Sequence, residues 1–232
     1  YGTTPHAGTW TYGLPELPGA RTAVKSATRV ANPGCYATSV ALALAPLAAA
    51  GLIALDDIVV VSASGTSGAG RSPSDALLAT QVMGSMSAYK VGGVHQHTPE
   101  MEQSIALAAG RDVRLSFTPL LAPMPRGIVS TCTATVNEGV TVAALRAALH
   151  AAYDDEPFVH VLPEGQWPQT SSVGGTNAAH LQVALDAHSG RAVVVSAIDN
   201  LGKGAAGQAL QNANLLLGLP ETMGLTSNGV AP

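Results

Sequence analysis

The strand-like segments of this chain are gathered in its second half, and this grouping constrains the fold more than any other feature. Alternating or β-branched runs predict five strands there: Val113–Thr118, Gly127–Val136, Phe158–Leu162, His180–Leu185 and Ala192–Ile198. One clear helix, Val142–Tyr153, lies among them. Strands grouped in this way predict an α+β domain whose mixed or antiparallel sheet is covered by helices on one face.

The first half contains fewer strands and longer helices. Val24–Ala31 and Ile58–Ser62 are strand-like, and Tyr36–Ala50 predicts a helix that Pro46 kinks or splits. Pro99–Ala109 predicts a helix with proline at its first position and Thr98 as N-cap. The last predicted helix covers 205–217.

The composition restricts the setting in which this chain works. Hydrophobic residues make up 47% of the 232 residues and charged residues 11%, so we expect a partner subunit to cover much of the surface. The net charge of −4 without a basic block argues against nucleic-acid binding. No apolar run approaches the roughly 18 residues of a membrane span. Two cysteines are too few for a disulfide framework, and together these features predict a cytoplasmic protein without a membrane partner.

Cys35 is the first candidate for chemistry. It follows the turn Asn32-Pro33-Gly34 and opens an apolar helix. A helix N-terminus favours the thiolate and so lowers the thiol pKa, and glycine before the cysteine permits a positive φ and leaves room for a substrate. A buried, inert cysteine is the competing interpretation. Cys132, within an alternating strand, is predicted to be structural.

His95 and His97 are candidates for the base that such a nucleophile needs. In an extended segment the pattern His-x-His points both rings to one side. Two imidazoles also suit zinc, but Glu100 is the one nearby candidate for a third ligand, so no metal is predicted. Structural or surface histidines are the third interpretation, and the sequence does not choose between His95 and His97 as the base.

Two segments of small residues and arginine suit an anion. The loop Ser64–Arg71 follows a strand and offers backbone N–H groups, hydroxyls and a guanidinium, while Arg126 lies at the start of another strand. Gly202–Gly207 matches G-x-G-x-x-G, but no second strand with an acidic residue follows it. We therefore reject it as a pyrophosphate site, although Lys203 and the bare amides could still line an active site.

Six segments together resemble the N-acetyl-gamma-glutamyl-phosphate reductase family of NADP-dependent enzymes in arginine biosynthesis. They are Trp10–Leu17, Ala31–Thr38, Ser64–Arg71, His95–Glu100, Pro125–Gly127 and Asn200–Gln208. The resemblance implies NADPH-dependent reduction of an acyl phosphate to a semialdehyde through a thioester on Cys35. It also implies a glyceraldehyde-3-phosphate dehydrogenase-like catalytic domain and a homo-oligomer, either a dimer or a tetramer.

The resemblance also implies roles for individual residues. Cys35, His95 and His97 would be catalytic. The expected substrate contacts are Ser64, Ser67, Arg71, Glu100, Arg126 and Lys203, and the expected cofactor contacts are Gly34, Gly68, Asn200 and Gly202. Three alternatives stay open: a Cys/His acyl transferase or thioesterase, a related dehydrogenase acting on another acyl phosphate, and a scaffold domain in which Cys35 is inert.

The resemblance lastly predicts how the chain divides. Residues 1–40 would end an NADP-binding domain, 41–204 would form the catalytic and dimerisation domain, and 205–232 would return to the NADP-binding domain. The family's amino-terminal Gly-rich loop has no counterpart here, and the chain opens with a Pro/Gly-rich loop rather than Met. We therefore expect a carboxy-terminal two-thirds of a longer protein, which by itself does not bind NADP tightly.

Overall fold

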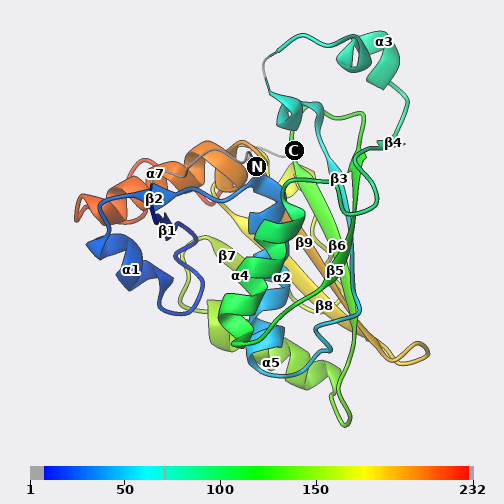
Figure 1. Cartoon of the computed structure of the whole chain (residues 1–232), viewed down its shortest axis with the longest axis vertical. Coiled ribbons are helices and arrows are strands. Elements are labelled where there is room, and N and C mark those ends of the chain that lie inside the picture. The colour runs from blue at the N-terminus through cyan, green and yellow to red at the C-terminus, as the bar shows by residue number, and fades with distance from the viewer. Residues whose placement is uncertain (1–7, 71, 230–232) are drawn as a thin grey trace.

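A seven-stranded mixed sheet is the centre of this computed structural model, which describes residues 8–70 and 72–229 (Figure 1). Its strand order is β4 (Ser87–Ala88), β5 (Leu115–Leu121), β3 (Ile58–Ser64), β6 (Ile128–Thr135), β9 (Arg191–Ile198), β8 (Ala179–Asp186) and β7 (Val159–Val161). The β3–β5 and β7–β8 pairs are parallel, and the other pairs are antiparallel. The five strands predicted in the second half all form, as β5 to β9.

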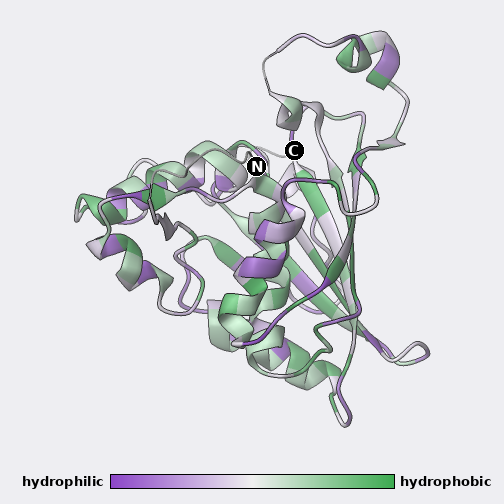
Figure 2. Ribbon diagram, viewed as in Figure 1, coloured by the Kyte–Doolittle hydropathy of each residue, from purple (hydrophilic) through white to green (hydrophobic). Residues whose placement is uncertain are grey.

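Helices pack on one face of this sheet (Figure 1). They are α2 (Cys35–Ala49), α4 (Thr98–Ala109) and α5 (Val142–Tyr153). Hydrophobic residues run along the strands and these helices (Figure 2), and α2 is buried on nearly all sides, as a helix without a polar face must be. On the other face, Val59 and Val61 of β3 keep 42% and 38% of their surface exposed. The predicted α+β sheet with helices on one face is confirmed.

Pro46 lies inside α2 and does not split it, contrary to that part of the prediction. A proline at position 46 removes the N–H that would bond to the carbonyl of Leu42. The hydroxyl of Tyr153, from α5, donates to that carbonyl at 2.8 Å instead. The tertiary contact thus satisfies the group that the proline leaves unpaired, and the helix continues to Ala49.

Two other local predictions were wrong. The expected strand Val24–Ala31 instead begins in helix α1 (Ala20–Ser26), because Ala, Arg and Lys favour helix and only Val24 of this helix is buried. Only its last two residues form a strand, β2 (Val30–Ala31). β2 pairs in parallel with β1 (Thr11–Tyr12). Thr98 is not the N-cap of α4, since it already lies in the helix and His97 precedes it as N-cap.

The elements from the two ends of the chain lie together beside the sheet (Figure 1). There α1 packs against α7 (Gly207–Leu216), which follows a π-helical turn, Gly202–Ala206. The remaining short helices are η1 (Thr66–Ala69), η2 (Asp75–Leu77), α3 (Ala79–Val82) and α6 (Thr170–Val173). Within the described ranges, no helix combines the length and apolar character needed to cross a membrane.

Candidate active site

Cys35 is the first residue of α2, directly after the turn Asn32-Pro33-Gly34. Gly34 is the N-cap and is extended, with φ −70° and ψ 151°, so no positive φ is used. A Cβ on Gly34 would lie 2.4 Å from Nε2 of His97. Glycine is therefore required because the imidazole of His97 fills the space that we had expected a substrate to use.

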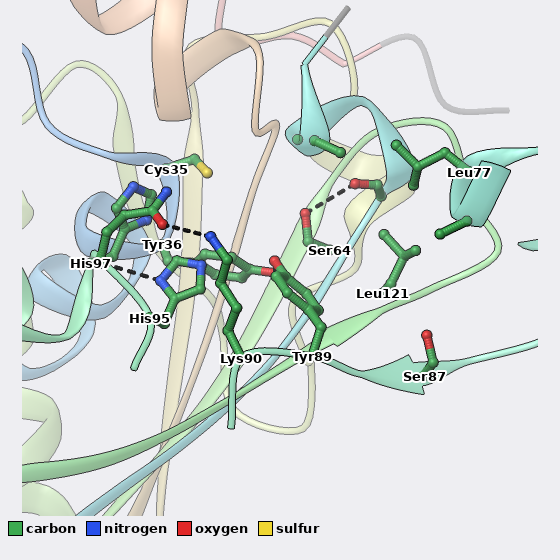
Figure 3. A pocket seen from close by; sticks show the side chains of 15 residues that line it. Cys35, Tyr36, Ser64, Leu77, Ser87, Tyr89, Lys90, His95, His97 and Leu121 are labelled. Carbon is green, nitrogen blue, oxygen red and sulfur yellow. Dashed lines mark hydrogen bonds between the residues drawn. The ribbon is translucent and has the colours of Figure 1, made fainter. Parts of the chain in front are cut away.

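Cys35, His95 and His97 line one cavity of about 430 Å³ (Figure 3). The two histidine rings lie 4.9 Å apart in an edge-to-face arrangement, although their segment forms turns rather than an extended strand. The backbone N–H of His97 donates to Nδ1 of His95 at 3.1 Å, so a neutral His95 carries its hydrogen on Nε2. The structure thus brings the three predicted catalytic residues together.

Two tyrosines, Tyr36 and Tyr89, also line this cavity, and the sequence did not lead us to predict either of them. The hydroxyls of Tyr36 and Tyr89 lie 2.8 Å apart, and the Tyr36 ring contacts both histidine rings edge-on. The position of Tyr36 directly after the nucleophile was a signal that could have found it. Tyr89 carried no such signal, because it comes from β4's flank, which only the fold brings to the cavity.

Burial is the largest influence on the pKa values of the candidate catalytic groups. It raises the pKa of Cys35; the Cys35 and Tyr36 N–H groups oppose this, and the charge of Glu100 adds to it. Burial lowers the pKa of His95 to about 4, with contributions from His97 and Lys90. Burial also lowers the pKa of His97, while Glu100 opposes that shift. The predicted lowering of the thiol pKa by the helix N-terminus is outweighed by desolvation, so the resting thiol holds its proton.

The loop after β3 brings some predicted residues to the cavity and uses others structurally. Ser64 and Gly68 line the cavity. The side chain of Ser67 instead accepts a hydrogen bond from Nδ2 of Asn200 at 3.0 Å, and Oδ1 of Asn200 accepts from the N–H of Gly127 at 2.7 Å. Asn200 therefore ties two loops together. Gly202 is packed so closely that a Cβ would lie 2.0 Å from the carbonyl oxygen of Thr176.

Two of the predicted cationic contacts, Arg126 and Lys203, do not line the cavity. Arg126 pairs with the buried Asp199, its Nη2 lying 2.7 Å from Oδ2. Lys203 is fully buried and pairs with Glu16. Arg71 lies outside the described residues. Among the residues that the structure describes, Lys90 is the one lysine or arginine that lines the cavity, and it has an unusual φ of 45°.

Glu100 and Cys132 occupy structural positions. Glu100 does not line the cavity; it lies behind the nucleophile turn, where Oε1 accepts the N–H of Gly34 at 2.8 Å. Cys132 is fully buried in β6, and burial raises its pKa to about 12. The prediction of a structural cysteine at this position agrees with that burial.

Alkylation of Cys35 tests the charge state of the site. We expect iodoacetamide to modify Cys35 slowly at neutral pH, with a midpoint above that of an ordinary thiol, about 8.5, because burial disfavours the thiolate. Mass spectrometry of the purified chain between pH 6 and 10 measures the rate. A midpoint at or below pH 8 would show that the helix N-terminus dominates instead.

Comparison with known proteins places the chain among semialdehyde dehydrogenases in fold. A profile of the family described as "Semialdehyde dehydrogenase, dimerisation domain" matches residues 35–200. Aspartate semialdehyde dehydrogenase II from Vibrio cholerae has a TM-score of 0.70 and 18% identity, covering 89% of this chain and 68% of that one. A probable aspartate-semialdehyde dehydrogenase from Pseudomonas aeruginosa has a TM-score of 0.69 and 19% identity, covering 92% and 70%. The predicted fold is confirmed.

Sequence relatives are much closer. Proteins named N-acetyl-gamma-glutamyl-phosphate reductase are 65% identical in Acidothermus cellulolyticus, 61% in Arthrobacter sp. and 61% in Streptomyces coelicolor. Each match extends over all 232 residues of this chain and 67% of the relative.

Proposed function

Because this chain belongs to the N-acetyl-gamma-glutamyl-phosphate reductase family, we propose that it carries the site at which N-acetyl-glutamyl 5-phosphate is reduced. The product is N-acetyl-glutamate 5-semialdehyde, phosphate is released, and the step belongs to arginine biosynthesis. The observation that carries this proposal is a thiol, Cys35, in one cavity with two imidazoles. A thiol beside a base is the arrangement needed for covalent acyl transfer.

The first half of the reaction forms a thioester. Because the resting thiol is protonated, a base removes its proton as the sulfur attacks the acyl carbon. The C–S bond forms, the bond from that carbon to the phosphate oxygen breaks, and phosphate leaves with its electron pair. The negative groups of the substrate meet Lys90 and Ser64, which line the cavity. Arg126 and Lys203 are not assigned here, since both are paired elsewhere.

The second half reduces the thioester. A bound NADPH would supply the hydride to the thioester carbon, and a histidine would then protonate the oxygen of the hemithioacetal. Breaking the C–S bond then releases the aldehyde and returns the proton to Cys35. Reduction through sulfur is favoured because a thioester accepts hydride more readily than a carboxylate does.

His97 is the histidine that we assign to proton transfer. Its Nε2 edge lies against Gly34, next to Cys35. Burial lowers the pKa of His97, and the charge of Glu100 counteracts this shift. Burial lowers the pKa of His95 to about 4, and its Nδ1 accepts the backbone N–H of His97. His95 is therefore assigned to positioning His97.

The described residues supply only part of a cofactor site. Of the four predicted contacts, Gly68 lines the cavity. Gly34, Asn200 and Gly202 instead contact His97, Ser67 and Thr176, respectively. These residues do not by themselves fit a dinucleotide, so no hydride-transfer step is assigned to any of them. The family supports a nicotinamide cofactor, and NADPH is our proposal for it. The predicted division at residues 40 and 204 and the cytoplasmic setting belong to the same proposal.

The reverse reaction tests this function. We expect the protein at its natural length to reduce NADP in the presence of N-acetyl-glutamate semialdehyde, with a strict requirement for phosphate. Absorbance at the wavelength of NADPH reports the rate. Acyl transfer or thioester hydrolysis without any nicotinamide would support the transferase or thioesterase alternative, and a preference for another semialdehyde would support the related dehydrogenase.

The uncovered face of the sheet supports the homo-oligomer. Val59 and Val61 are exposed on β3, an inner strand of the sheet, within the segment that matches a dimerisation domain. We expect Val59→Glu with Val61→Glu to weaken self-association about 100-fold or more, because charges would be buried in an apolar interface. Sedimentation velocity measures it, with Leu107→Glu on exposed α4 as the control. An unchanged sedimentation coefficient would exclude this face as the dimer contact.

A further inference from the structure

Glu100 of α4 contacts the nucleophile turn of a different helix. Its Oε1 accepts the backbone N–H of Gly34 at 2.8 Å and the hydroxyl of Tyr12 at 3.1 Å. Gly34 is the N-cap of α2, and it has no side chain with which to cap the helix. A glutamate three residues after an N-cap commonly reaches back to the N–H of its own N-cap. Here the glutamate three residues after His97 reaches the N-cap residue of α2 instead.

This contact links the two candidate catalytic residues through one carboxylate. Gly34 directly precedes Cys35, and His97 lies three residues before Glu100 on the same turn of chain. The Nε2 edge of His97 packs on Gly34, where a Cβ would lie 2.4 Å away. Movement of the Gly34 peptide would therefore displace both the sulfur and the imidazole.

We infer that Glu100 is a positioning residue of the reductase site: its carboxylate fixes the Gly34 peptide, which directly precedes Cys35 and on which His97 packs, and its charge favours the imidazolium formed at His97. The inference rests on the proposed function and replaces the predicted substrate contact of Glu100. A negative charge beside the imidazole stabilises the charged product of proton transfer. The same negative charge disfavours the Cys35 thiolate, so Cys35 keeps its proton until a substrate arrives.

Other charged and titratable groups also face this pair and bear on its pH dependence. Around Cys35 and His97 these groups are Tyr36, Tyr89, Lys90, His95 and Glu100. Glu100 is the acid in this set. Removing the charge of Glu100 should therefore lower the pKa values of both Cys35 and His97. The substitution leaves the other groups around them in place.

Two substitutions separate the geometric role from the charge. Glu100→Gln keeps an oxygen that can accept from Gly34 but removes the charge, and Glu100→Ala removes both. We expect the alkylation midpoint of Cys35 to move to lower pH in both variants. We expect kcat to fall about 100-fold in Glu100→Ala with little change in KM, since a misplaced nucleophile loses roughly this factor. Glu100→Gln should recover part of that loss.

Glu102 provides a matched control on the same helix. Its Oε1 accepts the backbone N–H of Leu115 at 3.2 Å and takes no part in the cavity. Glu102→Gln should leave the alkylation midpoint and kcat unchanged, and a Cys35→Ser background corrects for any other labelling. The alkylation profile does not depend on reductase activity, so it tests the role of Glu100 even where the proposed function fails. An unchanged midpoint in Glu100→Gln, or a rise in KM alone, would overturn the inference.

Discussion

Cys35→Ser is expected to lower kcat by about 10⁴-fold or more while leaving the fold intact. The serine hydroxyl ionises far above neutral pH and is a much poorer nucleophile, so no thioester equivalent can accumulate. Serine matches cysteine in shape, and Cys35 is only half-buried at the helix start, so the packing of α2 is kept. Steady-state kinetics of the phosphate-dependent reverse reaction, with circular dichroism to verify folding, measures the effect.

Cys132→Ser is the matched control for this substitution. Cys132 is fully buried in β6 and does not line the cavity, so its loss should leave kcat unchanged. It should destabilise the chain by about 1–3 kcal/mol, because a hydroxyl replaces a thiol in apolar surroundings. Substantial turnover in Cys35→Ser would remove Cys35 from the role of nucleophile, whatever the control shows.

The placement of Cys35, His95 and His97 in one cavity could be predicted because local sequence carries the features that point to it. Cys35 follows a turn that starts a helix, and His95 and His97 are close enough in sequence to share one wall. The sheet could be predicted for a similar reason, because alternating and β-branched residues within each strand favour the extended backbone of that same strand. In both cases the signal lies within about ten residues of the feature that it predicts.

Predictions failed where a distant partner decides the outcome. Pro46 looked like a helix break, but Tyr153 supplies the missing donor from another helix. Arg126 was predicted to clamp an anion, and the fold pairs its guanidinium with Asp199, a partner that the local sequence does not reveal. The pKa of Cys35 depends on how deeply the fold buries it, and a short sequence motif does not contain that burial. None of these partners can be identified from the segment that they modify.

Lys203 is the clearest case of a distant partner, because it looked like an active-site cation and is instead part of the core. Its ammonium donates to Oε1 of Glu16 at 2.5 Å and to Oε1 of Gln211 at 2.8 Å. The side chains of both members of the ion pair are fully buried. Burial pushes the pKa of Glu16 up, but the charge of Lys203 and its hydrogen bond outweigh it, so this pKa lies below its ordinary value.

Lys203→Met should therefore destabilise the chain by about 3–5 kcal/mol, because it leaves the Glu16 carboxylate buried without its cation. Without Lys203, burial raises the pKa of Glu16 above its unfolded value. The loss of stability should therefore be smallest below about pH 4.5, where Glu16 is protonated in both the folded and the unfolded chain. It should grow as the pH rises, because the buried Glu16 must then either ionise without a cation or keep a proton that the unfolded chain has lost. Urea unfolding at pH 5 and pH 8 measures both effects, and Lys25→Met, on the exposed side of α1, should change stability by less than about 0.5 kcal/mol.

The double variant Lys203→Met with Glu16→Leu distinguishes a buried pair from a general requirement for polar groups. It removes both charges, and the Gln211 side chain still accepts from Asn177 and donates to Glu221. We expect it to recover at least about half of the stability lost in Lys203→Met, because an apolar pair in place of a buried ion pair is often close to neutral. If the double variant were as unstable as the two single losses added together, the pair would contribute no coupling, and the fold would need Lys203 for another reason.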